Sequence, residues 1–154
     1  MVEELRLPLI GERVEAGLPG LPGFPGFPGF PSPADDFIER SLDLNEQLVS
    51  NPIATFFVRA SGNSMDGAGI HDGDLLVVDR SVTPSHGSVV VAIIDGGLTV
   101  KRLTKRGMRM SLISEPNKLD QGRYSPIEIG EETDAIIWGV VTWSVHKMET
   151  ACTR

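Results

Sequence analysis

Short hydrophobic runs rich in Val, Ile and Phe recur along the chain after residue 53, separated by Gly, Asp, Pro or Ser. The runs of this kind are 54–60, 74–79, 88–94, 98–103, 108–113 and 135–145. Each has the length of a β-strand, and no helical spacing of apolar residues lies between them. The pattern therefore predicts six strands in a mainly β fold, arranged as a curled antiparallel sheet or a small barrel.

The sequence Asp95-Gly96-Gly97 separates the third and fourth of these runs. Asp-Gly pairs are typical of tight turns between antiparallel strands, because both central residues of such a turn adopt positive φ. We therefore expect a β-hairpin with its turn at this point.

One short helix is predicted before the strands. The sequence Ser32-Pro33-Ala34-Asp35-Asp36 offers a capping serine, a proline at the first helical position and acidic residues in the first turn. Ile38, Leu42 and Leu48 give the segment one apolar face, and Asn51-Pro52 closes it. The helix is expected to run to about residue 50.

Glycine and proline are concentrated in five consecutive Gly-X-Pro triplets, from Gly17 to Pro31. The tract is too short for a collagen triple helix, whereas a proline-rich recognition ligand and a semi-rigid linker both fit its composition. The interpretation that we favour is a linker. We therefore expect an extended N-terminal arm over residues 1–33 and a folded core over residues 34–154.

The chain has 154 residues, with 14 Lys and Arg against 21 Asp and Glu, for a net charge of -7. This length suits one domain and an arm. An acidic chain without a large basic patch repels a phosphate backbone, so direct sequence-specific DNA binding is not expected.

Cysteine usage and the start of the chain bear on the compartment. The one cysteine, Cys152, excludes an intramolecular disulfide and a cysteine-based metal cage. The first ten residues lack the basic start of a signal peptide, and no later apolar run approaches the roughly 20 residues of a membrane span. These features predict a cytoplasmic protein with no membrane segment.

Ser64 is the first candidate catalytic residue. It lies in Ser61-Gly62-Asn63-Ser64-Met65, a Gly-rich turn directly after a predicted strand. A hydroxyl at a strand end with free backbone N–H groups nearby has the parts of an acyl-transfer site. Taken alone this pattern is weak, because serines in such turns mostly serve to form the turn.

Lys101 is the second candidate, because it lies inside the run 98–103. Side chains alternate along a strand, so Lys101 and Arg102 point to opposite faces and one of them is expected to approach the interior. A lysine that acts as a base near neutral pH needs its pKa lowered by about 3 units, or about 4 kcal/mol of desolvation. A neutral lysine can then take the proton of a serine nucleophile.

Other constellations of reactive residues are less specific. His71-Asp72-Gly73-Asp74 has metal-binding residue types but no second ligand cluster. A Ser-His-Asp triad would need His71, His86 or His146 to reach Ser64, and none of these histidines lies in a recognisable motif. No nucleotide or cofactor motif is present, so we expect neither a cofactor nor a metal.

Several stretches match a known family: FPSPADD at 30–36, LDLN at 42–45, ATFFVRASGNSM, GDLLVVDRSVTPSHGSVVVAIIDG, LTVKRL and WGVVTWSVHK. On these stretches, residues 30–154 resemble the UmuD family of self-cleaving SOS mutagenesis proteins, which is related to the C-terminal domain of LexA-type repressors. The resemblance implies the β fold shared with signal peptidases. It also implies a serine endopeptidase in which Ser64 is the nucleophile, Lys101 the general base, and the backbone N–H groups of Ser64 and Asn63 bind the oxyanion.

The arm departs from the family pattern. In the family the cleaved bond precedes a single Gly-Phe-Pro-Ser-Pro, but here Pro28 precedes Gly29, and proline has the wrong backbone shape for a strand-like fit. The sequence Val14-Glu15-Ala16-Gly17-Leu18-Pro19 resembles the family's cleavage segment more closely. Cleavage between Ala16 and Gly17 is therefore predicted, with Pro28-Gly29 as the alternative.

The biological role implied by the resemblance is DNA-damage-induced mutagenesis. A RecA-ssDNA filament is expected to stimulate self-cleavage, and the processed homodimer is expected to join a Y-family, UmuC-like polymerase as its accessory subunit in translesion synthesis. Two alternatives stay open. One is a cleavable LexA-type or phage-type repressor, for which residues 1–35 are too short and too acidic to supply a DNA-binding domain. The other is a non-cleaving regulatory module of the same fold.

Overall fold

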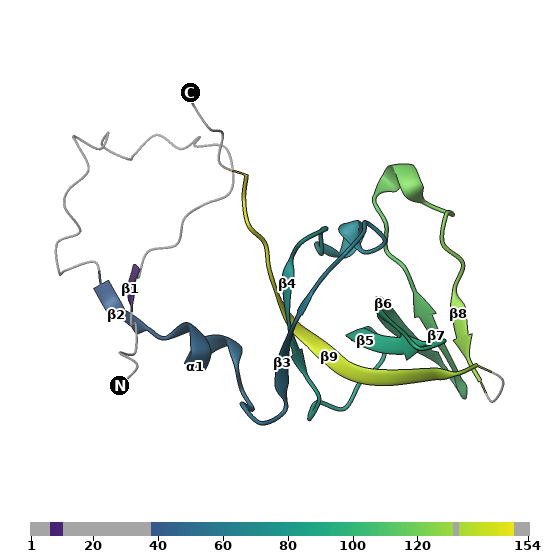
Figure 1. Cartoon of the computed structure of the whole chain (residues 1–154), viewed down its shortest axis with the longest axis horizontal. Helices are drawn as coiled ribbons and strands as arrows, with labels where there is room; N and C mark the ends of the chain where they lie inside the picture. The colour runs from purple at the N-terminus through teal and green to yellow at the C-terminus, as the bar shows by residue number, and fades with distance from the viewer. Residues whose placement is uncertain (1–6, 11–37, 131–132, 150–154) are drawn as a thin grey trace. The chain divides into compact units, whose positions relative to one another are not determined.

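The computed structural model describes residues 7–10, 38–130 and 133–149 (Figure 1). Contacts along the chain divide it into two compact units, Met1–Gln47 and Leu48–Arg154, which are described separately.

The first unit contains a two-stranded antiparallel sheet of β1 (Leu7–Ile10) and β2 (Ile38–Leu42). Leu7 pairs with Leu42 and Ile10 with Ile38, with an irregularity between Leu9 and Ile10. Strand β1 lies within the N-terminal segment that was predicted to form the extended arm.

A short helix, α1 (Leu44–Leu48), follows β2. Asp43 caps it, because its Oδ1 accepts a hydrogen bond from the backbone N–H of Asn45 at 2.8 Å. The predicted helix is thus wrong over Ile38–Leu42, which is a strand, while its proposed cap at Ser32-Pro33 lies outside the described residues. Apolar residues four apart fit both a helix and a strand, and the distant partner β1 decides in favour of the strand.

The second unit is one seven-stranded sheet in which all neighbouring strands are antiparallel. Its strands are β3 (Thr55–Arg59), β4 (Leu75–Asp79), β5 (Val89–Ile94), β6 (Gly97–Arg106), β7 (Arg109–Ile113), β8 (Ile127–Ile129) and β9 (Ala135–Val145), in the order β3-β4-β9-β5-β6-β7-β8. Two 3-10 helices, η2 (Asp66–Ala68) and η3 (Lys118–Asp120), lie in the connections.

All six predicted strands are present, whereas β8 was not predicted. The predicted hairpin turn is confirmed, since Asp95 (φ 48°) and Gly96 (φ 78°) join Ile94 to its partner Gly97. The mainly β prediction is therefore correct for this unit.

The sheet is open, with β3 and β8 at its edges, so it is a curled sheet and not a closed barrel. Strand β9 curves between β4 and β5 (Figure 1). The register of β9 shifts against β4 between Val77 and Val78, and against β5 between Val91 and Ala92. Such irregularities bend a strand and increase its twist, which curls the sheet.

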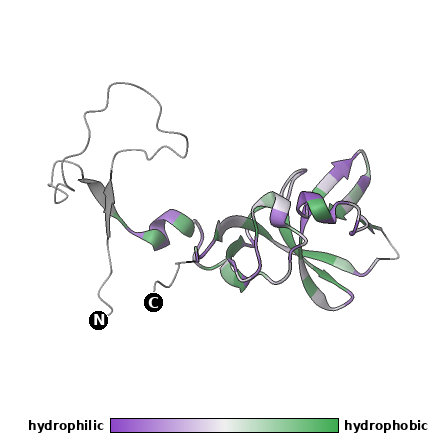
Figure 2. Ribbon diagram, turned by 90° about the horizontal axis from the view of Figure 1, so that it is seen from above, coloured by the Kyte–Doolittle hydropathy of each residue, from purple (hydrophilic) through white to green (hydrophobic). Residues whose placement is uncertain are grey.

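Hydrophobic residues concentrate along the sheet strands (Figure 2) and form two buried clusters. One cluster consists of Ala60, Met65, Ile70, Leu76, Val78 and Val91. The other consists of Val90, Ala92, Leu103, Leu112 and Val140. Neighbouring Val90 and Val91 fall in different clusters, as expected for a strand that is covered on both faces.

Across residues 7–10, 38–130 and 133–149, no helix has the length and apolar character that a membrane span requires.

Gly139 on β9 is a sensitive position of this core. A Cβ atom added there would lie 2.7 Å from Val78 Cγ1 and 3.2 Å from Arg80 Cγ. We expect Gly139→Ala to destabilise the protein by about 1–3 kcal/mol, since overpacking shifts side chains from their preferred positions. Urea unfolding should show this loss. Gly130→Ala is the control, because no heavy atom lies within 4 Å of its added Cβ. Equal unfolding midpoints for the two variants would contradict the prediction.

Candidate active site

Ser64 lies in the turn between β3 and η2, and hydrogen bonds fix the first part of this turn. The backbone N–H of Ala60 donates to Asp74 O at 2.8 Å, and the N–H of Gly73 donates back to Ala60 O at 2.9 Å. Gly62 has a φ of +85°, a conformation that favours glycine, and its N–H donates to Asp72 Oδ1 at 2.7 Å. Met65 (3% exposed) anchors the turn in the core directly after Ser64.

The residue before Ser64 is held by its side chain. Tyr124 Oη donates to Asn63 Oδ1 at 3.0 Å, and Asn63 Nδ2 donates to Asp120 Oδ2 at 3.4 Å. Within the described part of the chain, the backbone N–H groups of Asn63 and Ser64 donate to no other group. Two adjacent backbone donors beside a serine hydroxyl can stabilise a developing oxyanion.

Lys101 on β6 reaches this turn. Its half-buried Nζ donates to Ser64 Oγ at 3.1 Å and to Val100 O at 3.0 Å. Both acceptors are uncharged, and desolvation by burial lowers the pKa of the Lys101 ammonium. A lysine with a lowered pKa in hydrogen-bond contact with a hydroxyl can exchange a proton with it.

Arg102 does not share the surroundings of Lys101. Its Nε and Nη2 donate to Glu115 Oε1 and Oε2 at 2.7 and 2.8 Å, and its Nη1 donates to Gly87 O at 2.6 Å. Hydrogen bonding to Glu115 raises the pKa of Arg102, so the guanidinium stays charged. Both neighbours are thus partly buried, and only Lys101 contacts Ser64.

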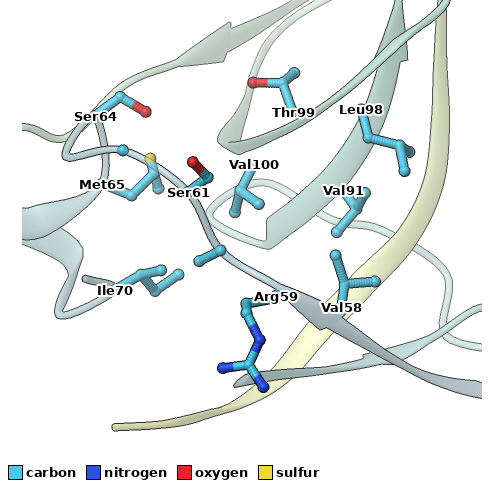
Figure 3. A pocket seen from close by; sticks show the side chains of 12 residues that line it. Val58, Arg59, Ser61, Ser64, Met65, Ile70, Val91, Leu98, Thr99 and Val100 are labelled. Atoms are coloured by element: carbon cyan, nitrogen blue, oxygen red, sulfur yellow. The ribbon is translucent and has the colours of Figure 1, made fainter. Parts of the chain in front are cut away.

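A cavity of about 220 Å³ opens beside Ser64 (Figure 3). Its apolar walls are formed by Val58, Met65, Ile70, Val91, Leu98 and Val100. They come from β3, β5, β6 and the segment after Ser64, because the curled sheet brings the end of β3 opposite β6. A cavity of this kind can accept a small apolar side chain next to the serine hydroxyl.

The histidines form a separate cluster. Asp74 (2% exposed) accepts hydrogen bonds from the His71 N–H, from Ser144 Oγ and from His146 Nδ1. Burial acts to raise the pKa of Asp74, but these hydrogen bonds outweigh it and lower the pKa. The rings of His71 and His146 lie 5.0 Å apart in an edge-on arrangement.

No histidine among residues 38–130 and 133–149 hydrogen-bonds to Ser64. His71 Nδ1 lies 3.4 Å from Asp66 Oδ1, and His86 Nδ1 accepts from the Lys105 N–H at 3.0 Å. The arrangement therefore gives no support to a Ser-His-Asp triad.

Sequence reasoning did not identify three sets of contacts: the Tyr124–Asn63–Asp120 hydrogen bonds, the Arg102–Glu115 ion pair and the His146–Asp74 pair. Each joins residues from different elements, and no local motif marks such a pair in advance. The predicted cleavage residues Ala16 and Gly17, and the alternative Pro28-Gly29, lie outside the described residues.

Comparison with known proteins places these features in a family. The model of the family described as Peptidase S24-like matches residues 8–142. The chain is 44% identical over 140 residues to Protein ImpA of Salmonella typhimurium, covering 91% of this chain and 83% of that protein. It is 46% identical over 141 residues to Protein MucA of Escherichia coli, covering 90% of this chain and 84% of that protein. It is 45% identical over 140 residues to Protein SamA of Salmonella typhimurium strain LT2, covering 91% and 85%.

These relatives are UmuD-family proteins, so the resemblance found in the sequence is confirmed. They support a general function in SOS mutagenesis and DNA repair as a polymerase accessory protein, and the family match supports serine peptidase activity. On the match over residues 8–142, the chain belongs to the peptidase S24-like family.

Proposed function

We propose that this protein is a self-cleaving serine endopeptidase in which Ser64 is the nucleophile and Lys101 the general base. The observation that carries the proposal is the 3.1 Å contact between Lys101 Nζ and Ser64 Oγ, made by a lysine whose burial lowers its pKa. A neutral amine at this distance is within reach of the hydroxyl proton.

The reaction has two stages. Neutral Lys101 takes the proton of Ser64 as Oγ attacks the scissile carbonyl carbon, and the backbone N–H groups of Ser64 and Asn63 hold the oxyanion. The protonated amine then gives this proton to the leaving nitrogen, the C–N bond breaks, and an acyl-enzyme forms. Water attacks the ester with Lys101 again as base, which releases the new carboxyl end and restores Ser64.

The substrate is the protein's own N-terminal arm, residues 1–33, presented to the core of residues 34–154 in a strand-like conformation. The scissile bond is Ala16-Gly17. The alanine methyl group is apolar and fits in the cavity beside Ser64, whereas Pro28 in the alternative register has a fixed φ and no N–H to donate.

Cleavage serves an SOS function. A RecA-ssDNA filament stimulates it, and the shortened chain forms a homodimer that acts as accessory subunit of a Y-family, UmuC-like translesion polymerase. Similarity to UmuD-family proteins over some 90% of the chain supports this role. The net charge of -7 agrees with a protein that acts through protein partners and does not bind DNA directly.

Replacing either residue of the Ser64–Lys101 pair tests the activity directly. Ser64→Ala is expected to abolish self-cleavage, and Lys101→Met, which fills the same space without an amine, to slow it by about 10²- to 10⁴-fold. The assay is a time course of purified protein at alkaline pH, read by intact mass, with unfolding midpoints as a check on folding. Cleavage by folded Ser64→Ala at the parent rate would disprove the proposal.

The pH dependence of cleavage follows from the state of Lys101. Only the neutral amine accepts a proton, so the rate constant rises with pH through the pKa of Lys101. Desolvation lowers this pKa, and the midpoint of the rise is expected below the value of about 10.4 for an exposed lysine. First-order rate constants measured across a pH series give the midpoint. A rate that falls with rising pH, or a midpoint at the exposed-lysine value, contradicts a desolvated lysine base.

The position of the cleaved bond is tested on the product. N-terminal sequencing is expected to read Gly-Leu-Pro from Gly17. Ala16→Pro is expected to block this cleavage, because proline fixes φ and removes the N–H of a strand-like substrate, whereas Pro28→Ala as the control leaves the product unchanged. A product that starts at Gly29 or Phe30 would overturn the Ala16-Gly17 assignment and leave the peptidase proposal intact.

A further inference from the structure

Glu115 contacts the two elements that carry the proposed catalytic residues. Its carboxylate binds Arg102, the strand neighbour of Lys101, through Nε at 2.7 Å and Nη2 at 2.8 Å. Its backbone carbonyl accepts a hydrogen bond at 2.7 Å from the N–H of Gly67, three residues after Ser64. One residue of the β7–η3 connection thus joins β6, which carries Lys101, to the segment 61–67, which carries Ser64 and is called the serine turn below.

The contact with Gly67 leaves no room for a side chain. A Cβ atom added to Gly67 would lie 2.6 Å from Pro116 O and 3.0 Å from Glu115 O, both of which are backbone atoms. The glycine therefore allows the serine turn to approach the 115–116 backbone closely, and this backbone fixes where the turn sits.

The curl of the sheet brings the end of β3 opposite β6, but no strand pairing joins these two strands directly. The serine turn follows edge strand β3, and the sheet order separates β3 from β6 by β4, β9 and β5. Contacts outside the strand ladder are therefore needed to set the position of the turn against β6. Glu115 contacts β6 at Arg102, one residue from Lys101, and contacts the serine turn at Gly67, three residues after Ser64.

The geometry of the ion pair suits positioning. The side chains of Arg102 and Glu115 are 29% and 30% exposed, and water weakens their Coulomb attraction. Their two parallel hydrogen bonds nevertheless fix the guanidinium plane, and a third bond from Nη1 to Gly87 O holds its other side. Arg102 thereby holds the β6 backbone at the residue next to Lys101.

We propose that Glu115 is a positioning residue that sets the contact between Lys101 and Ser64 by binding Arg102 through its side chain and Gly67 through its backbone. This inference rests on the proposed self-cleavage. Glu115 does not touch the reacting atoms and acts through the two elements that it joins.

The surroundings of Lys101 indicate how its pKa changes when the contacts of Glu115 with Arg102 and Gly67 are lost. Among the described residues, the polar partners of its Nζ are Ser64 Oγ from the turn and Val100 O from β6 itself. Its strand partner on β5 is Val90, and the nearby charge of Arg102 is compensated by Glu115. If the Glu115 contacts are lost, water enters, and the loss of desolvation raises the pKa of Lys101 toward its ordinary value. The unpaired Arg102 charge acts in the opposite direction, but it is partly exposed and the entering water screens it.

The test compares Glu115→Ala and Glu115→Gln with the parent and with Glu128→Gln, a matched control at an exposed carboxylate on β8. Glu115→Ala is expected to slow self-cleavage by about 10- to 100-fold, since a displaced base loses its geometry, and to move the midpoint of the rate profile to higher pH. Glu115→Gln keeps the shape of the side chain with weaker hydrogen bonds, so its cleavage rate is expected to lie between those of the parent and Glu115→Ala. Glu128→Gln is expected to cleave at the parent rate and with the parent's pH midpoint.

A second measurement does not depend on cleavage. In a Ser64→Ala background, NMR titration of ¹³Cε-labelled lysines, with Lys101→Met to assign the signal, follows Lys101 directly. Adding Glu115→Ala to this background is expected to raise the titration midpoint of Lys101, and Glu128→Gln to leave it in place. A purely structural role for Glu115 would lower the unfolding midpoint without moving this titration.

The outcomes separate the two proposals. If the parent cleaves and Ser64→Ala does not, but Glu115→Ala keeps the parent's rate and pH midpoint, the positioning role is wrong and the peptidase proposal stands. If the parent does not cleave itself, the peptidase proposal fails, and the Lys101 titration still decides whether Glu115 controls the lysine's surroundings. An unchanged titration midpoint would overturn that role.

Discussion

The short contact between Lys101 and Ser64 constrains the rest of the fold, because an amine must be held partly out of water next to a hydroxyl. Each unit by which a lysine pKa is lowered corresponds to about 1.36 kcal/mol that folding has to supply. Val90, the strand partner of Lys101, belongs to the buried cluster that contains Leu103, whereas Met65 anchors the serine turn in the other cluster. The two buried clusters thus support the two sides of the contact, β6 with Lys101 and the turn with Ser64.

The curl of the sheet follows from that constraint. A flat sheet in the order observed would keep β3 and β6 apart by three intervening strands. The register shifts of β9 against β4 and β5 bend the sheet at its centre, and the end of β3 then faces β6 across the cavity. The sheet remains open at β3 and β8, so the curl needed at the site is reached without closing a barrel.

The strands of the second unit could be predicted because apolar runs of strand length and the Asp95-Gly96 turn are local signals. Strand β8 has three residues, too few for a pattern, and β2 was mistaken for a helix because its partner β1 is almost thirty residues away in the sequence. Ser64 and Lys101 were predicted as site residues from motifs, each lying within one segment. Glu115, Tyr124 and Asp74 were not, because their roles arise from contacts across elements that only the folded chain brings together.

A neutral lysine also requires that carboxylates stay away from it, and this chain has 21 acidic residues. A carboxylate close to Nζ would favour the ammonium form and raise the lysine pKa. Among the described residues, the acidic side chains near the serine turn have other partners. Asp66 lies beside His71, Asp72 accepts from the Gly62 N–H, Asp74 binds Ser144 and His146, Glu115 binds Arg102, and Asp120 binds Asn117 and Arg123. These pairings hold the carboxylates in fixed positions and leave Lys101 with uncharged acceptors. For the proposed lysine base, contacts that keep the carboxylates away from Nζ contribute to the chemistry without touching the reacting atoms.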